Sequence, residues 1–180
     1  MEYYLMEEEP GNRIPYGINK DRAVDMRKLL KGEYDGIPER NIVQMDLPME
    51  TFFPDLLCSP WVMVSRPFME VIRMYMPKTV YRQVKLWCRE TGINHTYYMP
   101  FLPELDCMSD QTRYNSIGNR ITERVLCREQ IRKTPIFMIK GYHEKKCIAA
   151  RLDLVESLLR REVRGIQLER VRQDMEPVRC

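Results

Sequence analysis

The stretch SPWVMVSRPFMEVIRMYMPKTVYRQVKLWC, residues 59–88, decides the fold class. Its apolar start at residues 61–64 predicts a short buried strand. Ser65 then offers an N-cap, and Pro67 suits the first helical turn, where its missing N–H is not needed. Apolar residues follow at the spacing of one helix face: Phe68, Val71, Ile72 and Tyr75. Residues 79–88 alternate between two faces, as a strand does, so the stretch predicts strand, helix and strand.

A second unit of the same plan is predicted near the C-terminus. Residues 147–150 are short and apolar, residues 151–162 predict an amphipathic helix with Gly165 as its cap, and residues 166–171 alternate as a last strand. The apolar positions of the two helices match at a constant offset: Leu152 with Phe68, Val155 with Val71, and Leu159 with Tyr75. The match is either a coincidence between two ordinary units or an internal duplication.

Further strands and loops surround these two units. Strands are predicted at residues 2–6, 41–47, 93–99 and 136–139, and residues 121–126 form a strand or a short helix. The segments 79–88 and 93–99 flank a turn, which predicts a β-hairpin. One charged residue, Arg82, interrupts the apolar face of that hairpin. Residues 100–119 contain two prolines and then a polar run, which predicts a long surface loop.

Together these elements predict an α+β fold with a mixed or antiparallel sheet and two main amphipathic helices. A chain of 180 residues has the length of a single domain. We expect an irregular acidic part in residues 1–60, an α+β core in residues 61–171 and a loose tail in residues 172–180. The role of residues 7–40 stays open at this stage.

The charge balance is nearly even, but the charges are distributed unevenly. The formal net charge of +3 is too small to indicate a dedicated nucleic-acid-binding protein. Residues 1–60 hold seven basic and twelve acidic side chains, whereas residues 61–150 hold fifteen basic and eight acidic ones. Either the two parts complement each other within the molecule, or a charged partner surface is present.

The cysteines and histidines do not form a metal-binding pattern. The six cysteines are widely spaced without a C-x-x-C pair, and the only histidines, His95 and His143, are far apart in the chain. We therefore expect no structural metal, no cofactor and no disulfide, as in a reducing cytoplasm. No secretory signal opens the chain, and no apolar stretch approaches the ~20 residues of a membrane span, so no membrane partner is expected.

Several motifs in a fixed order resemble one bacterial immunity-protein family. The motifs are FFPDLL at residues 52–57, SPWVMVSRPFMEVIRMYMP at 59–77, PELDC at 103–107, IFMIKGY at 136–142 and CIAARLDLVESLL at 147–159. The likeness covers roughly residues 41–171 and departs from the family pattern at Trp61 and Arg66. The chain resembles the eleventh-numbered immunity family of polymorphic toxin systems.

That resemblance implies a cytoplasmic, non-enzymatic protein that binds a cognate toxin and neutralises it by occlusion. Two other functions stay open. One is a small metal-dependent nuclease or hydrolase, which Glu104, Asp106 and the triplet Glu144-Lys145-Lys146 with Asp55 upstream could serve. The other is a general protein-interaction adaptor. The oligomeric state also stays open.

The residue types and their spacing give little support for a catalytic function. Neither His95 nor His143 has a serine, cysteine or acid in a local motif, so we expect no catalytic residues. His95 is expected to be a satisfied core residue and His143 an exposed turn residue. Cys107 is the one cysteine whose polar surroundings leave room for an exposed, reactive thiol.

Partner binding is instead predicted on a hairpin face and in a neighbouring loop. Tyr81, Lys85 and Trp87 share one face of a strand, and Tyr98 lies on the next strand. Aromatic and basic residues of this kind are frequent binding hot spots, unless a helix of the same protein covers them. The loop of residues 106–119 is either a plain connection or a recognition loop. The predicted partner-binding residues are Lys85, Trp87, Tyr98, Asp106, Arg113 and Tyr114.

Overall fold

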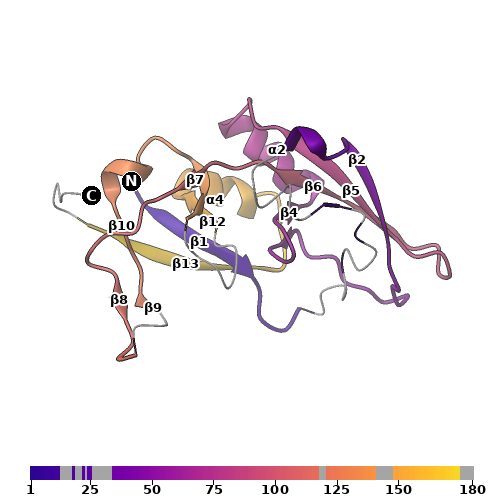
Figure 1. The fold of residues 1–180 in the computed structure, drawn as a ribbon, viewed down its shortest axis with the longest axis horizontal. Coiled ribbons are helices and arrows are strands. Elements are labelled where there is room, and N and C mark those ends of the chain that lie inside the picture. The colour runs from indigo at the N-terminus through magenta and orange to yellow at the C-terminus, as the bar shows by residue number, and fades with distance from the viewer. Residues whose placement is uncertain are drawn as a thin grey trace.

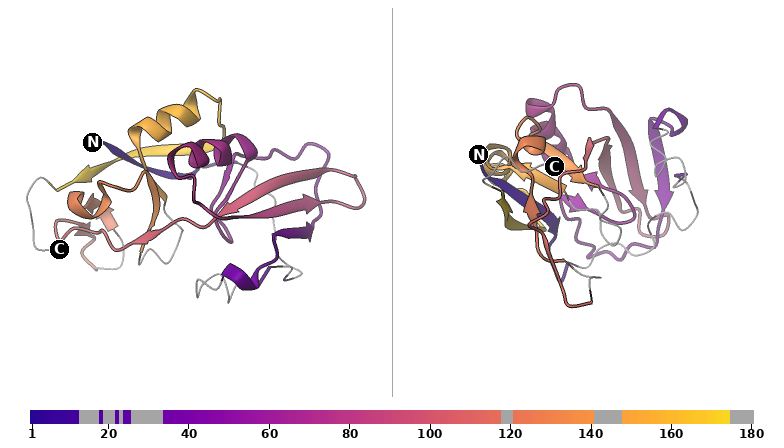
Figure 2. Two further views of the ribbon diagram at one scale, coloured as in Figure 1. Left: turned by 90° about the horizontal axis from the view of Figure 1, so that it is seen from above. Right: turned by 60° about the vertical axis from the view of Figure 1, so that its left-hand side comes forward.

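The computed structural model describes residues 1–12, 18, 22, 24–25, 34–117, 121–140 and 148–174. It is an α+β fold in which two sheets lie next to each other along the long axis of the molecule (Figure 1). Two helices, α2 (Arg66–Tyr75) and α4 (Leu152–Leu159), lie side by side and pack against the sheets (Figure 2). The predicted fold class is therefore confirmed.

The first sheet is built around the N-terminal strand. Its strands are, in spatial order, β10 (Val125–Leu126), β13 (Ile166–Gln173), β1 (Tyr3–Glu8), β12 (Ile148–Arg151), β11 (Ile136–Ile139) and β7 (Glu104–Leu105). β1 pairs antiparallel with β12 on one side and with β13 on the other. Residues 1–60 thus contribute an inner strand to the larger sheet. This regular strand differs from the irregular N-terminal part that was expected for these residues.

The second sheet contains the predicted hairpin. Its spatial order is β2 (Arg40–Gln44), β5 (Tyr81–Trp87), β6 (Asn94–Pro100), β4 (Met63–Val64) and β3 (Leu56–Leu57). β5 and β6 pair antiparallel in continuous register from Tyr81 opposite Pro100 to Trp87 opposite Asn94, so the hairpin is confirmed. β2 pairs parallel to β5 and forms the edge of the sheet.

Short elements complete the fold. They are the 3-10 helix η1 (Tyr34–Gly36), the helix α3 (Arg128–Ile131) and the two-stranded sheet of β8 (Arg113–Tyr114) and β9 (Ile121–Glu123). Residues 100–119, expected to be one surface loop, contain β7 and β8. β13 runs to Gln173, and Asp174 is only 2% exposed, so the ordered chain continues beyond the predicted last strand.

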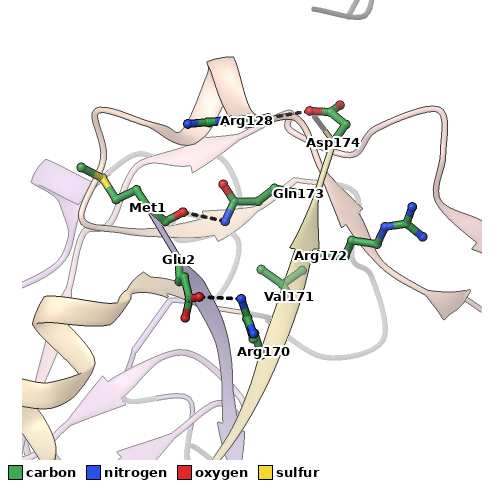
Figure 3. Close-up of a pocket in the computed structure, with 8 residues that line it drawn as sticks. All are labelled: Met1, Glu2, Arg128, Arg170, Val171, Arg172, Gln173 and Asp174. Atoms are coloured by element: carbon green, nitrogen blue, oxygen red, sulfur yellow. Dashed lines mark hydrogen bonds and ion pairs between the residues drawn. The ribbon is translucent and has the colours of Figure 1, made fainter. Parts of the chain in front are cut away.

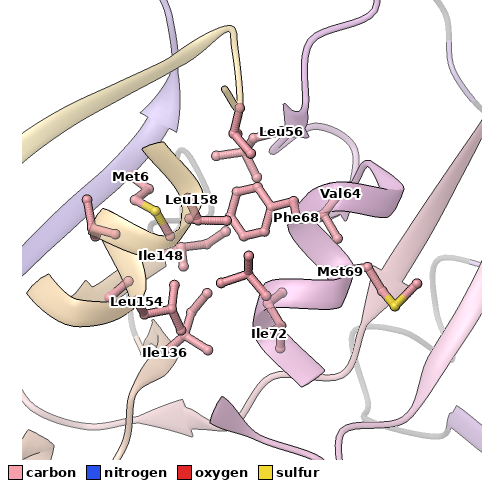
Figure 4. Packing of buried hydrophobic residues seen from close by; sticks show 14 of the residues in the cluster. Met6, Leu56, Val64, Phe68, Met69, Ile72, Ile136, Ile148, Leu154 and Leu158 are labelled. Carbon is pink, nitrogen blue, oxygen red and sulfur yellow. The ribbon is translucent and has the colours of Figure 1, made fainter. Parts of the chain in front are cut away.

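The helices and the first sheet share one core (Figure 4). From α2, Phe68, Val71 and Ile72 are fully buried, as their spacing predicted. Tyr75 is partly exposed, and its hydroxyl donates to the Asp153 backbone carbonyl at 2.8 Å, which ties α2 to α4. Strand residues such as Ile148 complete the cluster.

The predicted buried face of α4 is wrong at two of its three positions. The helix buries Leu154, Val155 and Leu158, while Leu159 is 51% exposed. Leu158 and Leu159 are adjacent apolar residues, so the sequence pattern allows two helical phases, and packing against α2 selects the one that points Leu158 inward. The two helices therefore differ in phase, and the structure does not confirm an internal duplication.

Candidate functional site

Among the described residues, the carboxylates considered for metal chemistry do not form a metal site. Within the described part of the chain, no group of three or more potential ligands lies close together. Asp106 forms an ion pair with Lys140 at 3.7 Å, and the Asp55 carboxylate accepts the Arg164 backbone N–H at 2.6 Å, so Asp55 holds a loop in place. His143 and the Glu144-Lys145-Lys146 triplet lie outside the described residues.

His95 is partly buried and stacks on an aromatic ring. Its ring centroid lies 4.6 Å from that of Phe53, with the planes nearly parallel, and 4.7 Å from that of Tyr97. Burial lowers the pKa of His95, and the nearby Asp55 carboxylate partly opposes this effect. Its contacts are those of a packed side chain.

The cysteines differ from expectation at two positions. Cys107 is completely buried, and burial raises its pKa to about 12, so the exposed thiol expected there is wrong. The reason is that the Cys107 carbonyl accepts the Cys127 N–H at 2.8 Å, which draws Cys107 into a core cluster. Cys127 is disulfide-bonded, so the expected absence of disulfides is also wrong. A hydrogen bond with Thr91 lowers the pKa of Cys88, but that side chain is only 3% exposed.

At its outer end, one face of the second sheet lies outside the core clusters that the described residues form. We call it the open face, and its six residues are Ile42, Gln44, Lys85, Trp87, Asn94 and Thr96. They form two rows across three strands: Ile42, Lys85 and Thr96 in one, and Gln44, Trp87 and Asn94 in the other. Ile42 is 66% exposed, and neither Ile42 nor Trp87 belongs to a core cluster.

Helix α2 covers only the inner end of this sheet surface. The β5–β6 hairpin extends well beyond the helix (Figure 2). Where the helix reaches the sheet, a hollow of about 220 Å³ remains, lined from α2 by Met69 and Arg73 and from the strands by Tyr81, Gln83 and Tyr98, with Glu39 and Arg40 beside them. The guanidinium of Arg73 lies 5.7 Å from the centre of the Tyr81 ring.

The six predicted partner-binding residues fall into two separate groups. Lys85, Trp87 and Tyr98 share the surface of the second sheet, as predicted. Arg113 and Tyr114 form β8, which lies at the opposite end of the molecule from the hairpin (Figure 1), and Asp106 directly follows β7 of the first sheet. The structure brings the first three together and keeps the second three apart from them.

Two larger cavities lie elsewhere. One of about 510 Å³ at the end of β13 is lined by Arg128, Arg170 and Arg172 (Figure 3). Many of its polar groups bond one another: Arg170 pairs with Glu2, and the Asp174 carboxylate accepts the Arg128 backbone N–H at 3.0 Å.

The other cavity, of about 830 Å³, has mainly apolar walls. It lies between η1, the loop that follows α2 and the segment that joins the two sheets. Tyr34 and Phe101 stack within it at a centroid distance of 3.9 Å. Neither of the two cavities combines a nucleophile, a base and an electrophilic stabiliser in the way that catalysis requires.

The contribution of β2 to the open face was not predicted from the sequence. Arg40, Ile42 and Gln44 join this surface because β2 pairs with β5, a strand about forty residues further along the chain. The pairing itself has no local signal. The alternation of residues along β2 did contain a local signal for its two faces. Val43, Met45 and Leu47 are the buried residues of this alternation, so Ile42 falls on the opposite, polar face.

No protein-family model matches the chain, and no curated protein matches it. Among the described residues, no helix has both the length and the apolar character needed to cross a bilayer.

Proposed function

We propose that this chain is an immunity protein that binds a cognate toxin and neutralises it by covering the toxin's active site, without turnover. The observation that carries the proposal is the open face, where Trp87 and the exposed Ile42 lie beside Lys85 and outside every core cluster. A partly exposed tryptophan beside a cation is the composition of a binding hot spot. The ordered motifs resemble an immunity-protein family, and this resemblance suggests that the partner is a toxin.

The open face suits binding because it is carried on paired strands. β5 is hydrogen-bonded on both sides, to β2 and to β6, so the backbone under Lys85 and Trp87 is fixed before any partner arrives. A preorganised surface loses less conformational entropy on binding than a loop does. This favours the sheet group over the group that contains Arg113 and Tyr114, both in the short strand β8.

The charge of this surface specifies a complementary partner. Lys85 lies within the open face and Arg40 at its border, while none of the six residues of the face is acidic. An acidic patch on the toxin would complement it and would accelerate association. A standard inhibitory interface buries about 800 Å² on each partner, so the contact would extend from the open face into the hollow beside α2.

The test is co-expression with the toxin encoded directly upstream of the gene. Trp87→Ala should weaken the complex at least about thirtyfold, which corresponds to ~2 kcal/mol for loss of a hot-spot side chain. Lys85→Glu should slow association by placing a like charge opposite the acidic patch. Growth rescue and the dissociation constant of the purified complex are the two readouts.

The matched controls are Arg113→Ala and Tyr114→Ala, which change exposed residues of the other group. They should rescue growth as well as the unchanged chain does. If they fail while the Trp87 variant protects, the toxin binds at the β8 end and the open face is wrong. If the unchanged chain neither binds nor protects, the proposed function is wrong.

A further inference from the structure

The outer edge of the second sheet is a strand with unpaired backbone groups. In the described part of the chain, β2 pairs with β5 alone and is the last strand on that side. Edge strands of this kind are templates for the addition of another strand. The question is which strand fits.

The hydrogen bonds of the β2–β5 ladder show which groups of β2 point outward. Gln83 donates its N–H to the Glu39 carbonyl at 2.8 Å, and Met45 donates its N–H to the Trp87 carbonyl at 2.9 Å. Because the direction of the backbone groups alternates along a strand, the residues between them that face β5 are Asn41 and Val43. Arg40, Ile42 and Gln44 therefore point their N–H and C=O groups away from the sheet.

We propose that β2 pairs antiparallel with β2 of a second copy of this chain, about a two-fold axis at Ile42. In this register Ile42 lies opposite the second copy's Ile42, and Arg40 lies opposite its Gln44. Each opposed pair would exchange two backbone hydrogen bonds, since all three residues point outward. The outward groups at these three residues would then find partners.

The side chains of β2 suit this pairing with themselves. The central Ile42 is 66% exposed and would be buried against an identical residue. On either side a cation faces a neutral amide, so the register contains no like-charge pair, which would oppose association. The Asn41 side chain is already used within the chain, because it donates to the Pro38 and Gln83 carbonyls at 2.9 and 3.2 Å. The pairing strand therefore keeps its shape.

Such a dimer would have a defined effect on the surface of the second sheet. Directly opposed residues in an antiparallel pair project from the same side of the sheet, so both open faces would be on one side of a continuous sheet. The proposal does not depend on toxin binding. A contact along one five-residue strand is small, so we expect a dimer that forms at micromolar concentrations and dissociates on dilution.

Sedimentation velocity of the purified full chain, from about 2 to about 500 µM, tests the proposal. The unchanged chain should pass from monomer to dimer in this range. Gln44→Glu should lower the dissociation constant about fivefold, because the new carboxylate would face Arg40 in two symmetric pairs at ~0.5 kcal/mol each. Gln44→Lys should raise it by a similar factor.

Ile42→Pro is the sharpest variant. Proline removes the outward N–H of Ile42, and an edge strand tolerates it there because that N–H is not part of the β2–β5 ladder. The variant should sediment as a monomer at every concentration and keep the unchanged circular dichroism spectrum. Ile117→Ala, which alters a 79% exposed residue of the other end, should dimerise normally. A chain that is monomeric throughout the range, or whose dimerisation ignores all three variants, overturns the proposal.

Discussion

At the scale of single residues, Arg82 shows how a polar exception on an apolar strand face is accommodated. Its Nε donates to the Ile37 carbonyl at 2.8 Å, and its Nη2 donates to the Tyr34 carbonyl at 3.3 Å. The guanidinium also lies 5.3 Å from the centre of the Phe101 ring. Arg82 therefore fastens η1 to the second sheet, and the charge is satisfied by carbonyl groups and an aromatic face rather than by a carboxylate.

His95 predicts how stability depends on pH. Burial lowers its pKa in the folded chain, whereas the unfolded value is about 6.5. The unfolded state therefore binds a proton at higher pH than the folded state does. The stabilisation from neutral His95 is fully present above pH ~6.5 and is lost as the pH falls through the lower, folded pKa.

Urea unfolding between pH 7.5 and pH 5 measures this effect. His95→Phe keeps a ring beside Phe53 and removes the titrating group, so the free energy of unfolding of the variant should fall less steeply with decreasing pH. Identical slopes for both chains would mean that His95 carries no part of the pH dependence.

At the scale of elements, the phase of α4 decides which leucine supports the core. Leu158 is fully buried among residues of α2 and the first sheet, whereas Leu159 is 51% exposed. Leu158→Ala should lower the free energy of unfolding by about 2–5 kcal/mol, as truncation of a buried leucine does. Leu159→Ala, the matched control one residue later, should lower it by less than ~1 kcal/mol. Chemical denaturation of both variants gives the comparison, and equal losses would contradict the observed phase.

The elements that the sequence predicts best are those with a single consistent pattern. The hairpin of β5 and β6 follows from alternation around a turn, and α2 follows from a proline in its first turn and one apolar stripe, while the hydroxyl of the predicted cap Ser65 makes no capping hydrogen bond. The prediction from the apolar pattern was wrong where two helical phases were equally apolar, as at Leu158 and Leu159. It also failed at Gly165, which lies well beyond the helix end at Leu159 and has a φ of +73°. A Cβ there would meet Pro54 Cβ at 2.6 Å, so Gly165 serves a close approach between distant segments.

At the scale of the whole molecule, no observed ion pair between described residues joins the acidic residues 1–60 to the basic residues 61–150. Among residues 1–12 and 34–60, the carboxylate in an observed ion pair is Glu2, and it pairs with Arg170 near the C-terminus. In the described part of the middle segment, Lys85 and Arg73 take part in no observed ion pair. Within the described residues, ion pairs between the acidic and the basic parts therefore do not account for the uneven distribution of charge.

The proposed complex with a toxin should depend on salt, because Lys85 lies in the proposed binding surface. Raising the salt concentration from about 50 to about 500 mM should slow association by at least tenfold, because long-range attraction between exposed charges is screened, while dissociation changes much less. Surface plasmon resonance at several salt concentrations measures both rates. A salt-independent association rate would remove the role proposed for Lys85.

The candidate site could be predicted only in part, because it is assembled from segments distant in the chain. Lys85, Trp87 and Tyr98 belong to one hairpin, so local alternation placed them on a common face. Their neighbour Ile42 reaches them through a parallel pairing that no local pattern reveals. Asp106, Arg113 and Tyr114 share a polar segment close in sequence to the hairpin. Proximity along the chain, however, does not bring a loop to a particular sheet.

The position of β1 has a consequence for synthesis on the ribosome. This strand is made well before both of its neighbours, β12 and β13, which lie within residues 148–173. While the rest of the chain is translated, Tyr3, Leu5 and Met6 remain without the strands that bury them. The β5–β6 hairpin can close long before this, since its strands are adjacent in the chain. The second sheet can thus form while the chain is still being translated, whereas the first sheet is completed only after β12 and β13 have been made.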